Sequence, residues 1–429
     1  MERTADTIAA IATAPGRGGV AIVRVSGPDA WIVAERVTGR HLTDADAGRF
    51  HRARFASVDD GLLLVFRGPR SYTGEDAVEL QGHGGSVAPR RVLEACLAAG
   101  ARLARRGEFT ERAFLNGRLD LSAAEAVIDL VDARTERAAD DAFARLGGAL
   151  TRPFERLYAE AIDLSSQLEH ALDFSEEELP PEFDVRLRAR VTELKAEVER
   201  LMATAREGRL LREGARVVLA GAPNAGKSSL MNALLGTDRA IVNAAAGTTR
   251  DAIEEGLVVG GWPICLIDTA GLRTTADPIE AEGVARAQAL IAQADVVLAL
   301  DCEMPGALNV HAKCDLDRSL ADVAPGVLRV SAKTGEGLPE LKCALAERLA
   351  QLAVDGDETC GADVTTRQRE LLEKAAAAFT RAHAQFAETD YVVAANEVRT
   401  AAEELGRLVG KTYSDDLLEA LFSRFCVGK

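Results

Sequence analysis

Residues 221–228 read GAPNAGKS, and they stand between an apolar stretch with strand character and a helix-forming stretch. This arrangement is typical of a phosphate-binding loop. Gly221 and Gly226 let the backbone bend so that its N–H groups face an anion at the positive end of a helix. Lys227 is then expected to reach the β- and γ-phosphates, and the Ser228 hydroxyl to hold Mg²⁺. The loop therefore predicts binding of a nucleoside triphosphate.

The composition is that of a large, acidic, multidomain protein. A chain of 429 residues exceeds one ordinary domain, and its net charge of −16 argues against broad unaided binding to nucleic acid. The seven cysteines are scattered without metal-ligand spacing, which indicates reduced thiols. The sequence has neither a secretory leader pattern nor an apolar run of about 18 residues. We expect a cytoplasmic protein without a membrane span.

The pattern of apolar residues divides the chain into four parts. Short apolar strands and glycine turns predict an α+β domain over 1–118, and alternating strands and helices predict a P-loop domain with a parallel sheet over 212–352. Residues 119–211 and 353–429 read as helix. Since inserted domains are tolerated where their ends lie close together, the fold class is a multidomain α/β protein with the nucleotide domain inserted into an all-α domain.

Amphipathic periodicity supports the helical assignment of the second part. Apolar residues recur every three or four positions, and helix packing is a sufficient explanation for them. The first set is Leu157, Ala161, Leu164, Leu168 and Leu172, and the second is Leu187, Val191, Leu194, Val198 and Leu201.

Two further motifs follow the phosphate loop at the spacing of a GTPase. The stretch GTTRD at 247–251 has the composition of a switch loop, in which Thr249 completes Mg²⁺ coordination only when a γ-phosphate is present. The stretch CLIDTAG at 265–271 is an apolar strand that ends in a metal-side motif. We expect Asp268 to act through a Mg²⁺-bound water and the Gly271 N–H to sense the γ-phosphate.

The base of the nucleotide is predicted from the stretches AKCD at 312–315 and SAK at 331–333. The carboxylate of Asp315 can accept hydrogen bonds from guanine N1–H and its exocyclic amine, and adenine offers no such pair of donors. The Ala332 N–H can donate to the guanine carbonyl. The nucleotide is therefore predicted to be GTP. Ala312 stands where GTPases usually have Asn, and the lost contact is expected to weaken guanine binding by about 1 kcal/mol.

Many GTPases carry a glutamine directly after the stretch that corresponds to CLIDTAG, and it orients the attacking water. This chain has Leu272 there, so hydrolysis must use other groups. One alternative is an arginine finger, for which Arg250 and Arg273 are candidates. The other is a monovalent cation, with oxygens from Asn224 and from the NAAAG loop at 243–247. Glu280 could orient the water, although a solvated carboxylate at a helix start is an equally good interpretation of that residue.

Several specific motifs lie outside the nucleotide domain. They are PGRGG at 15–19, SYTGED at 71–76 running through Glu79 to GHGG at 82–85, ERAFLNGRLD at 111–120, and the terminal FCVGK at 425–429. With these motifs the chain resembles the MnmE (TrmE) family of tRNA wobble-uridine modification GTPases from end to end.

The resemblance implies an N-terminal domain that binds a tetrahydrofolate derivative (5-formyl or 5,10-methylene) and forms a homodimer. It implies folate contacts at Arg24, Glu79, Arg118 and Lys429, and a K⁺ site at Asn224, Asn243, Ala245 and Thr248. It also assigns Glu280 as the catalytic glutamate. It implies a complex with the flavoprotein MnmG (GidA) as a heterotetramer, a tRNA substrate, and a need for Cys426 in modification.

The predicted site residues can be stated together. Catalysis is assigned to Glu280 and Cys426, and Mg²⁺ to Ser228 and Thr249. The GTP-contacting set is Asn224, Ala225, Gly226, Lys227, Ser228, Ser229, Asn243, Ala244, Ala245, Ala246, Gly247, Thr248, Thr249, Asp268, Thr269, Ala270, Gly271, Lys313, Asp315, Ser331, Ala332 and Lys333.

Two other functions are compatible with part of the sequence. A GTPase switch of ribosome assembly would share the phosphate loop, Leu272 and the cation site, but it should carry a basic RNA-binding module and has no reason to end in Cys426-Val427-Gly428-Lys429. A folate-binding regulatory protein that has lost efficient GTP turnover is suggested only by Ala312.

Overall fold

The computed structural model describes residues 6–172, 182–238, 254–268, 288–316, 326–353, 362–387 and 390–429. The loop containing Asn243 to Thr249, the residues Thr269, Ala270 and Gly271, and Glu280 lie outside the described residues. The chain forms two compact units, one of Met1–Ile128 with Gly406–Lys429 and one of Asp129–Leu405. None of the described helices is long and apolar enough to cross a membrane.

The first unit contains a six-stranded sheet in the order β3-β4-β5-β2-β1-β6. Its pairs are antiparallel apart from the parallel pair β1–β6. The strands are β1 (Ile8–Ile11), β2 (Val20–Ser26), β3 (Phe50–Phe55), β4 (Asp59–Phe66), β5 (Ala77–His83) and β6 (Arg102–Leu103). The helices are α1 (Ala30–Thr38), η1 (Asp44–Asp46), α2 (Ala88–Ala98), α3 (Glu108–Leu115), α4 (Leu121–Asp132) and α14 (Asp415–Phe422).

Alternation along the strands gives this sheet two different faces. One face buries residues such as Val23, Leu63 and Leu80 against α1 and α2. On the other face Val20, Phe50 and Leu62 are 60%, 71% and 40% exposed. The strand register puts these three residues on one side of the sheet. The same register places Arg24, Glu79 and Gln81 on this face, so it exposes apolar side chains among polar ones.

The C-terminal tail packs onto the start of α3 in the same unit. Val427 forms an isolated β-bridge with Arg106, and the Phe109 N–H donates to the carbonyl of Lys429 over 3.3 Å. Gly107 has φ +67, and a Cβ there would lie 2.6 Å from the carbonyl oxygen of Phe422. Glycine at 107 therefore allows the close approach that seats the tail.

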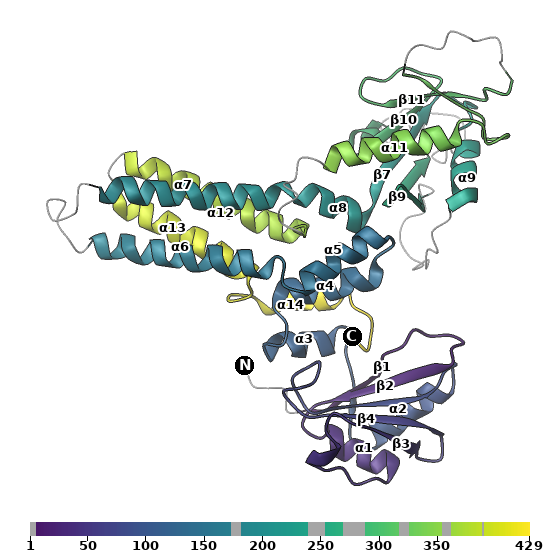
Figure 1. Cartoon of the computed structure of the whole chain (residues 1–429), viewed down its shortest axis with the longest axis vertical. Helices are drawn as coiled ribbons and strands as arrows, with labels where there is room; N and C mark the ends of the chain where they lie inside the picture. The colour runs from purple at the N-terminus through teal and green to yellow at the C-terminus, as the bar shows by residue number, and fades with distance from the viewer. Residues whose placement is uncertain are drawn as a thin grey trace, which may run out of the picture. The chain divides into compact units, whose positions relative to one another are not determined.

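The second unit holds the long helices side by side, as Figure 1 shows for α6 (Thr151–Leu172), α7 (Phe183–Ala203), α12 (Thr366–Ala387) and α13 (Tyr391–Leu408). Ion pairs link α6 to α7, α12 to α13 and α13 to α6. The predicted apolar positions on α6 and α7 are buried, with one correction. Leu172 is 41% exposed because it is the last residue of its helix.

The same unit contains the nucleotide domain, whose sheet has the order β12-β11-β10-β7-β9-β8. All pairs are parallel except β8–β9. The elements are β7 (Ala215–Gly221), α9 (Lys227–Asp238), β8 (Glu254–Val259), β9 (Trp262–Asp268), β10 (Val296–Leu300), β11 (Leu308–Ala312), β12 (Leu328–Val330) and α11 (Leu338–Ala353). The fold is the predicted multidomain α/β class.

A buried cluster of charges holds the connection from the nucleotide domain to α12. The helices α5 (Glu136–Leu146) and α8 (Ala205–Glu213) both contribute to it. Arg145 is fully buried and pairs with Asp129 and Asp141. Arg212 donates to the Val364 carbonyl, and the Asp363 N–H donates to Asp141 over 2.8 Å. Breaking such a network is costly because it leaves a charge buried without compensation.

Stability should depend on pH through Asp363. Burial, followed by the nearby carboxylates of Asp141 and Glu207, raises the pKa of Asp363 to about 7. Between about pH 4 and pH 7 the folded chain then holds a proton that the unfolded chain releases, so the free energy of unfolding falls as pH rises. Asp363→Asn should remove up to about 4 kcal/mol of that fall.

Urea unfolding of the wild type and of Asp363→Asn at pH 5 and pH 8 measures this difference. Asp140→Asn is the matched control, because Asp140 is an exposed carboxylate on α5. If the free energy of unfolding falls between pH 5 and pH 8 by the same amount in Asp363→Asn as in the wild type, the prediction is wrong.

Candidate functional site

The phosphate loop lies at the carboxyl edge of the second sheet, where ligands bind in open parallel sheets. It begins at Gly221, with φ +148, and a Cβ there would lie 2.6 Å from the Leu300 carbonyl oxygen. Gly226 has φ +103, and Asn224 has a left-handed φ of 63°. The α9 helix begins directly after the loop at Lys227. The local backbone therefore matches the turn that the sequence predicts.

The functional side chains of the loop are held inside the site. The Lys227 ammonium donates to the carbonyl oxygens of Gly221 and Ala222, each over 2.9 Å. The Ser228 hydroxyl donates to Asp268 Oδ2 over 2.6 Å. The phosphate loop and the CLIDTAG stretch thus meet through this hydrogen bond. A hydroxyl beside a carboxylate is a donor set that fits Mg²⁺. When bound, this ion neutralises charge that develops on the phosphates.

A second part of the site is a cavity of about 260 Å³ between the loop and the predicted base-reading residues. The Lys313 ammonium donates to the Asn224 carbonyl over 2.6 Å. The Ser331 hydroxyl donates to Asp315 Oδ1 over 2.7 Å and lowers the pKa of that carboxyl, so Asp315 is ionised and can accept. The residues lining the cavity are Gly226, Ser229, Leu230, Ala312, Lys313, Asp315, Leu316, Val330, Ala332 and Lys333.

A separate cavity of about 400 Å³ lies in the first unit and brings together three predicted folate residues, Arg24, Glu79 and Arg118. Arg24 Nε donates to Glu79 over 3.0 Å, and its guanidinium lies 5.4 Å from the ring centre of Tyr72. The volume is in the range of small-molecule sites. The cavity therefore offers an aromatic surface beside an ion pair and a further arginine.

Lys429 does not line this cavity, but it is connected to it through one residue. The Lys429 carbonyl accepts the Phe109 N–H, and the Phe109 ring lies 5.6 Å from the guanidinium of Arg24. Cys426 is exposed and free, and its carbonyl accepts the Gly107 N–H over 3.4 Å. The tail and the cavity are thus built around the same start of α3.

Sequence reasoning missed several residues of this cavity, namely Ser26, Phe66, Arg70, Ser71, Tyr72, Thr73 and Ala77. Three of them belong to the SYTGED motif, which signalled the family without assigning contacts. The Ser26 hydroxyl lies 2.6 Å from that of Thr73 and donates to Glu75 over 2.7 Å. Burial raises the pKa of Tyr72, so its phenol stays neutral.

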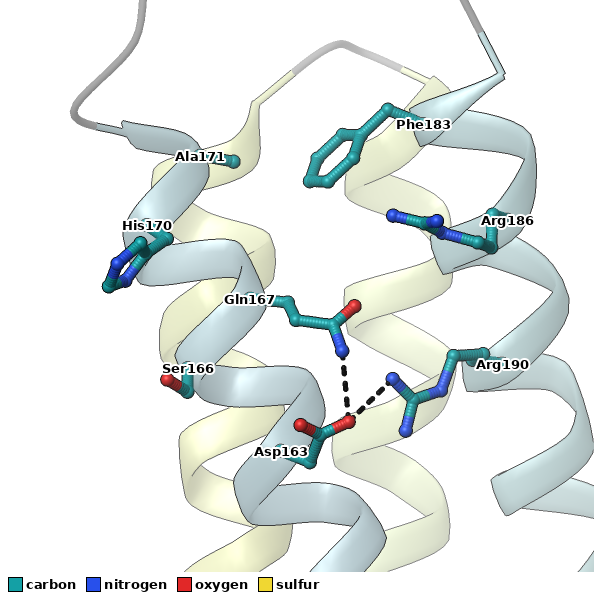
Figure 2. Close-up of a pocket in the computed structure, with 8 residues that line it drawn as sticks. All are labelled: Asp163, Ser166, Gln167, His170, Ala171, Phe183, Arg186 and Arg190. Carbon is teal, nitrogen blue, oxygen red and sulfur yellow. Dashed lines mark hydrogen bonds and ion pairs between the residues drawn. The ribbon is translucent and has the colours of Figure 1, made fainter. Parts of the chain in front are cut away.

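A groove of about 610 Å³ lies between α6 and α7, and none of the predicted site residues lines it (Figure 2). Asp163 accepts from Gln167 and from Arg190 there, over 2.9 and 2.8 Å. Phe183 and Arg186 reach over the space from α7. The Asp163 carboxylate is thus already paired with two groups of the groove.

Comparison with known proteins identifies the family. Residues 121–426 match the model of the MnmE helical domain, and residues 7–118 match the GTP-binding protein TrmE N-terminus. The second match covers every residue that lines the cavity of the first unit, and the first match reaches the tail as far as Cys426.

Curated relatives cover the chain almost completely. A protein called tRNA modification GTPase MnmE in Symbiobacterium thermophilum is 44% identical over 463 aligned residues, covering 99% of both chains. One of the same name in Chromobacterium violaceum is 43% identical and covers 100% of both. The G domain of the T. maritima FeoB iron transporter is 27% identical over 32% of this chain and 98% of its own, with a TM-score of 0.23 that supports no argument. With a family model over most of its length and full-length relatives above 40% identity, this chain belongs to the MnmE (TrmE) family.

Proposed function

We propose that the chain is a GTP-hydrolysing enzyme of tRNA modification. It acts with the flavoprotein MnmG to add an aminomethyl or carboxymethylaminomethyl group to carbon 5 of the wobble uridine in certain tRNAs. The observation that carries the proposal is the presence, in one chain of this family, of a guanine-type nucleotide site and of a cavity that joins Arg24, Glu79 and Arg118. A ribosome-assembly switch would require the first site and have no use for the second.

GTP binding in this proposal uses the described loop and base-reading residues. Lys227 carries the phosphates, and Ser228 holds Mg²⁺ with Thr249. Asp315 reads guanine, and the Asp315–Ser331 hydrogen bond supports this assignment because it aims an ionised carboxylate at the cavity. Adenine offers no matching donors, so a carboxylate there selects guanine.

Hydrolysis is proposed to use K⁺ instead of an arginine finger, with Glu280 orienting the water. The cation would sit among oxygens of Asn224, Asn243, Ala245 and Thr248. Asn224 supports this because its left-handed backbone, φ 63°, turns within the loop that faces the phosphates. A cation at this place supplies the charge that a finger would otherwise bring.

The one-carbon donor is proposed to be a tetrahydrofolate derivative bound in the first unit. Aromatic and apolar groups, Tyr72 and Phe66, suit a flat ring system. The carboxylate of Glu79 suits ring N–H donors, and Arg118 suits an anionic tail. Lys429, which does not line the cavity itself, is proposed to reach the bound folate from the adjoining tail, where Cys426 takes part in the modification.

A homodimer is proposed through the open sheet face of the first unit. Val20, Phe50 and Leu62 are exposed on that face, and large apolar side chains in solvent are a common mark of a partner surface. A second copy supplies the same apolar groups by two-fold symmetry. MnmG is proposed to join this dimer in a heterotetramer and to supply positive surface for tRNA, because a net charge of −16 disfavours unaided binding to RNA.

The division into domains is part of the same proposal. Residues 1–118 form the folate domain, and residues 119–211 with 353–429 form a helical domain interrupted by the nucleotide domain at 212–352. The single helical-domain model that runs from 121 to 426 supports the interruption.

GTPase activity should rise several-fold when K⁺ replaces Na⁺, because Na⁺ is too small for the proposed cage of oxygens. Asn224→Gly keeps the left-handed backbone and removes one oxygen, so it should lose this stimulation while binding GTP normally. Initial rates of phosphate release in matched K⁺ and Na⁺ buffers measure the effect. Equal rates in the two salts for the wild type would refute the cation site.

Arg118→Ala should weaken binding of 5-formyltetrahydrofolate at least about tenfold, since a charge-assisted hydrogen bond contributes about 1.5–3 kcal/mol. Arg91→Ala is the matched control, an exposed arginine on α2 outside the cavity. Isothermal titration of the full chain gives both affinities. If the two variants bind equally well, Arg118 does not contact folate.

Cells that carry Cys426→Ser should lose the carbon-5 wobble modifications, as should cells without the chain, because serine lacks the thiol. Cys302→Ser and Cys343→Ser are the matched controls, since both residues are exposed free cysteines of the second unit. Mass spectrometry of tRNA nucleosides reads out all four strains. If the modifications persist in the deletion strain, the proposed function is wrong and a ribosome-assembly switch is favoured.

A further inference from the structure

The base-reading residues follow a strand whose connection is unusually short. Strands β10 and β11 are parallel neighbours, paired through Leu298–Leu308 to Leu300–Val310. Residues 301–307 alone join them, with no helix between. Parallel neighbours ordinarily need a crossover of a dozen or more residues, usually a helix. The end of β11, which leads into Lys313 and Asp315, is therefore not held by a crossover helix.

Asp301, the first residue of this connection, binds the end of β11 instead. Its N–H donates to the Val310 carbonyl over 2.9 Å. Its Oδ1 accepts the N–H of Ala312 over 3.0 Å. Asp301 thus bonds to two alternate residues at the end of β11, Val310 and Ala312. They stand immediately before the turn that presents Lys313 and Asp315 to the base cavity.

The backbone around the cavity has left-handed residues, a conformation that neighbouring hydrogen bonds must stabilise. Among the described residues, four non-glycine positions have positive φ, and Asn224, Asp301 and Lys313 are three of them, at 63°, 50° and 58°. Residues in this region persist only where their surroundings determine them. Lys313 is held on one side by its bond to the Asn224 carbonyl and on the other by the bond from Ala312 to Asp301.

Ala312 explains why the carboxylate matters in this chain. A methyl group cannot form the hydrogen bonds that an asparagine amide would give at this position. We propose that Asp301 is a positioning residue of the guanine site, which holds the end of β11 through the Ala312 N–H and so aims Asp315 at guanine. The inference rests on nucleotide binding alone and is independent of folate, K⁺ and tRNA.

Another contact of Asp301 offers a competing explanation. His311 Nδ1 lies 3.1 Å from the same Oδ1 atom, so the carboxylate could serve only to pair with that histidine. The two explanations differ in what they need. An asparagine at 301 retains an oxygen that can accept the Ala312 N–H, but it has no charge to offer His311.

The test compares affinities of the full-length chain for GDP and for inosine diphosphate, which lacks the exocyclic amine. The variants are Asp301→Ala, Asp301→Gly and Asp301→Asn, with Glu303→Ala as the matched control because Glu303 is an exposed carboxylate of the same connection. Glycine adopts a φ of 50° without strain, so it removes the carboxylate even if the alanine variant fails to fold.

Loss of the carboxylate should weaken GDP binding about five- to tenfold, the effect of about one hydrogen bond. It should weaken inosine diphosphate binding by a smaller factor, because inosine keeps the N1–H that Asp315 also accepts and lacks only the exocyclic amine. The preference for GDP should therefore fall in Asp301→Gly and remain within about twofold of wild type in Asp301→Asn and Glu303→Ala. Equal weakening for both nucleotides would mean a general structural effect and overturn the proposal. So would a preference in Asp301→Asn as low as in Asp301→Gly.

A double-mutant cycle tests the link to the missing asparagine. In an Ala312→Asn background, where an amide can take over the anchoring, Asp301→Gly should cost less than about twofold in GDP affinity. The same five- to tenfold loss in both backgrounds would show that Asp301 does not compensate for Ala312.

Discussion

The parallel pairing of β7 with β9 and β10 is the interaction on which the nucleotide site depends. It places the ends of three strands at one edge, so that the phosphate loop, Asp268 and Leu300 become neighbours. The constraint is tight, because Gly221 has room only for a hydrogen against the Leu300 carbonyl. With this edge formed, Ser228 reaches Asp268, and α9 begins beside them, where the N-terminus of a helix can bind an anion.

The first unit depends on a comparable close contact at its C-terminal tail. Gly107 and Gly428 both have positive φ, and both lie where a Cβ would meet neighbouring backbone. The last residues of the chain are thereby joined to α3 and β1, far away in sequence. The buried guanidinium of Arg112 strengthens the same region through Asp6, Glu75 and Glu108. A C-terminal cysteine and an N-terminal cavity consequently share one folded unit.

Much of the architecture could be predicted because it depends on local patterns. The amphipathic spacing of α6 and α7 is a property of consecutive turns of helix, and those positions are buried apart from Leu172, where the helix ends. The phosphate loop could also be predicted from the sequence, since its glycines, lysine and serine lie within eight consecutive residues. The short β10–β11 connection was not predicted, because its importance depends on the two strands being parallel neighbours.

The sequence by itself determined the nucleotide loop, the choice of guanine, the helical periods and the family motifs, because each is carried by residues close together in the chain. Only the tertiary structure decided which distant groups meet. Arg24 and Glu79 are 55 positions apart, and Ser228 and Asp268 are 40 apart. Asp301 and Ala312 are 11 apart, yet their bond depends on strand register. A hydrogen bond needs two atoms within about 3 Å, and pairing of strands brings them there where sequence spacing cannot.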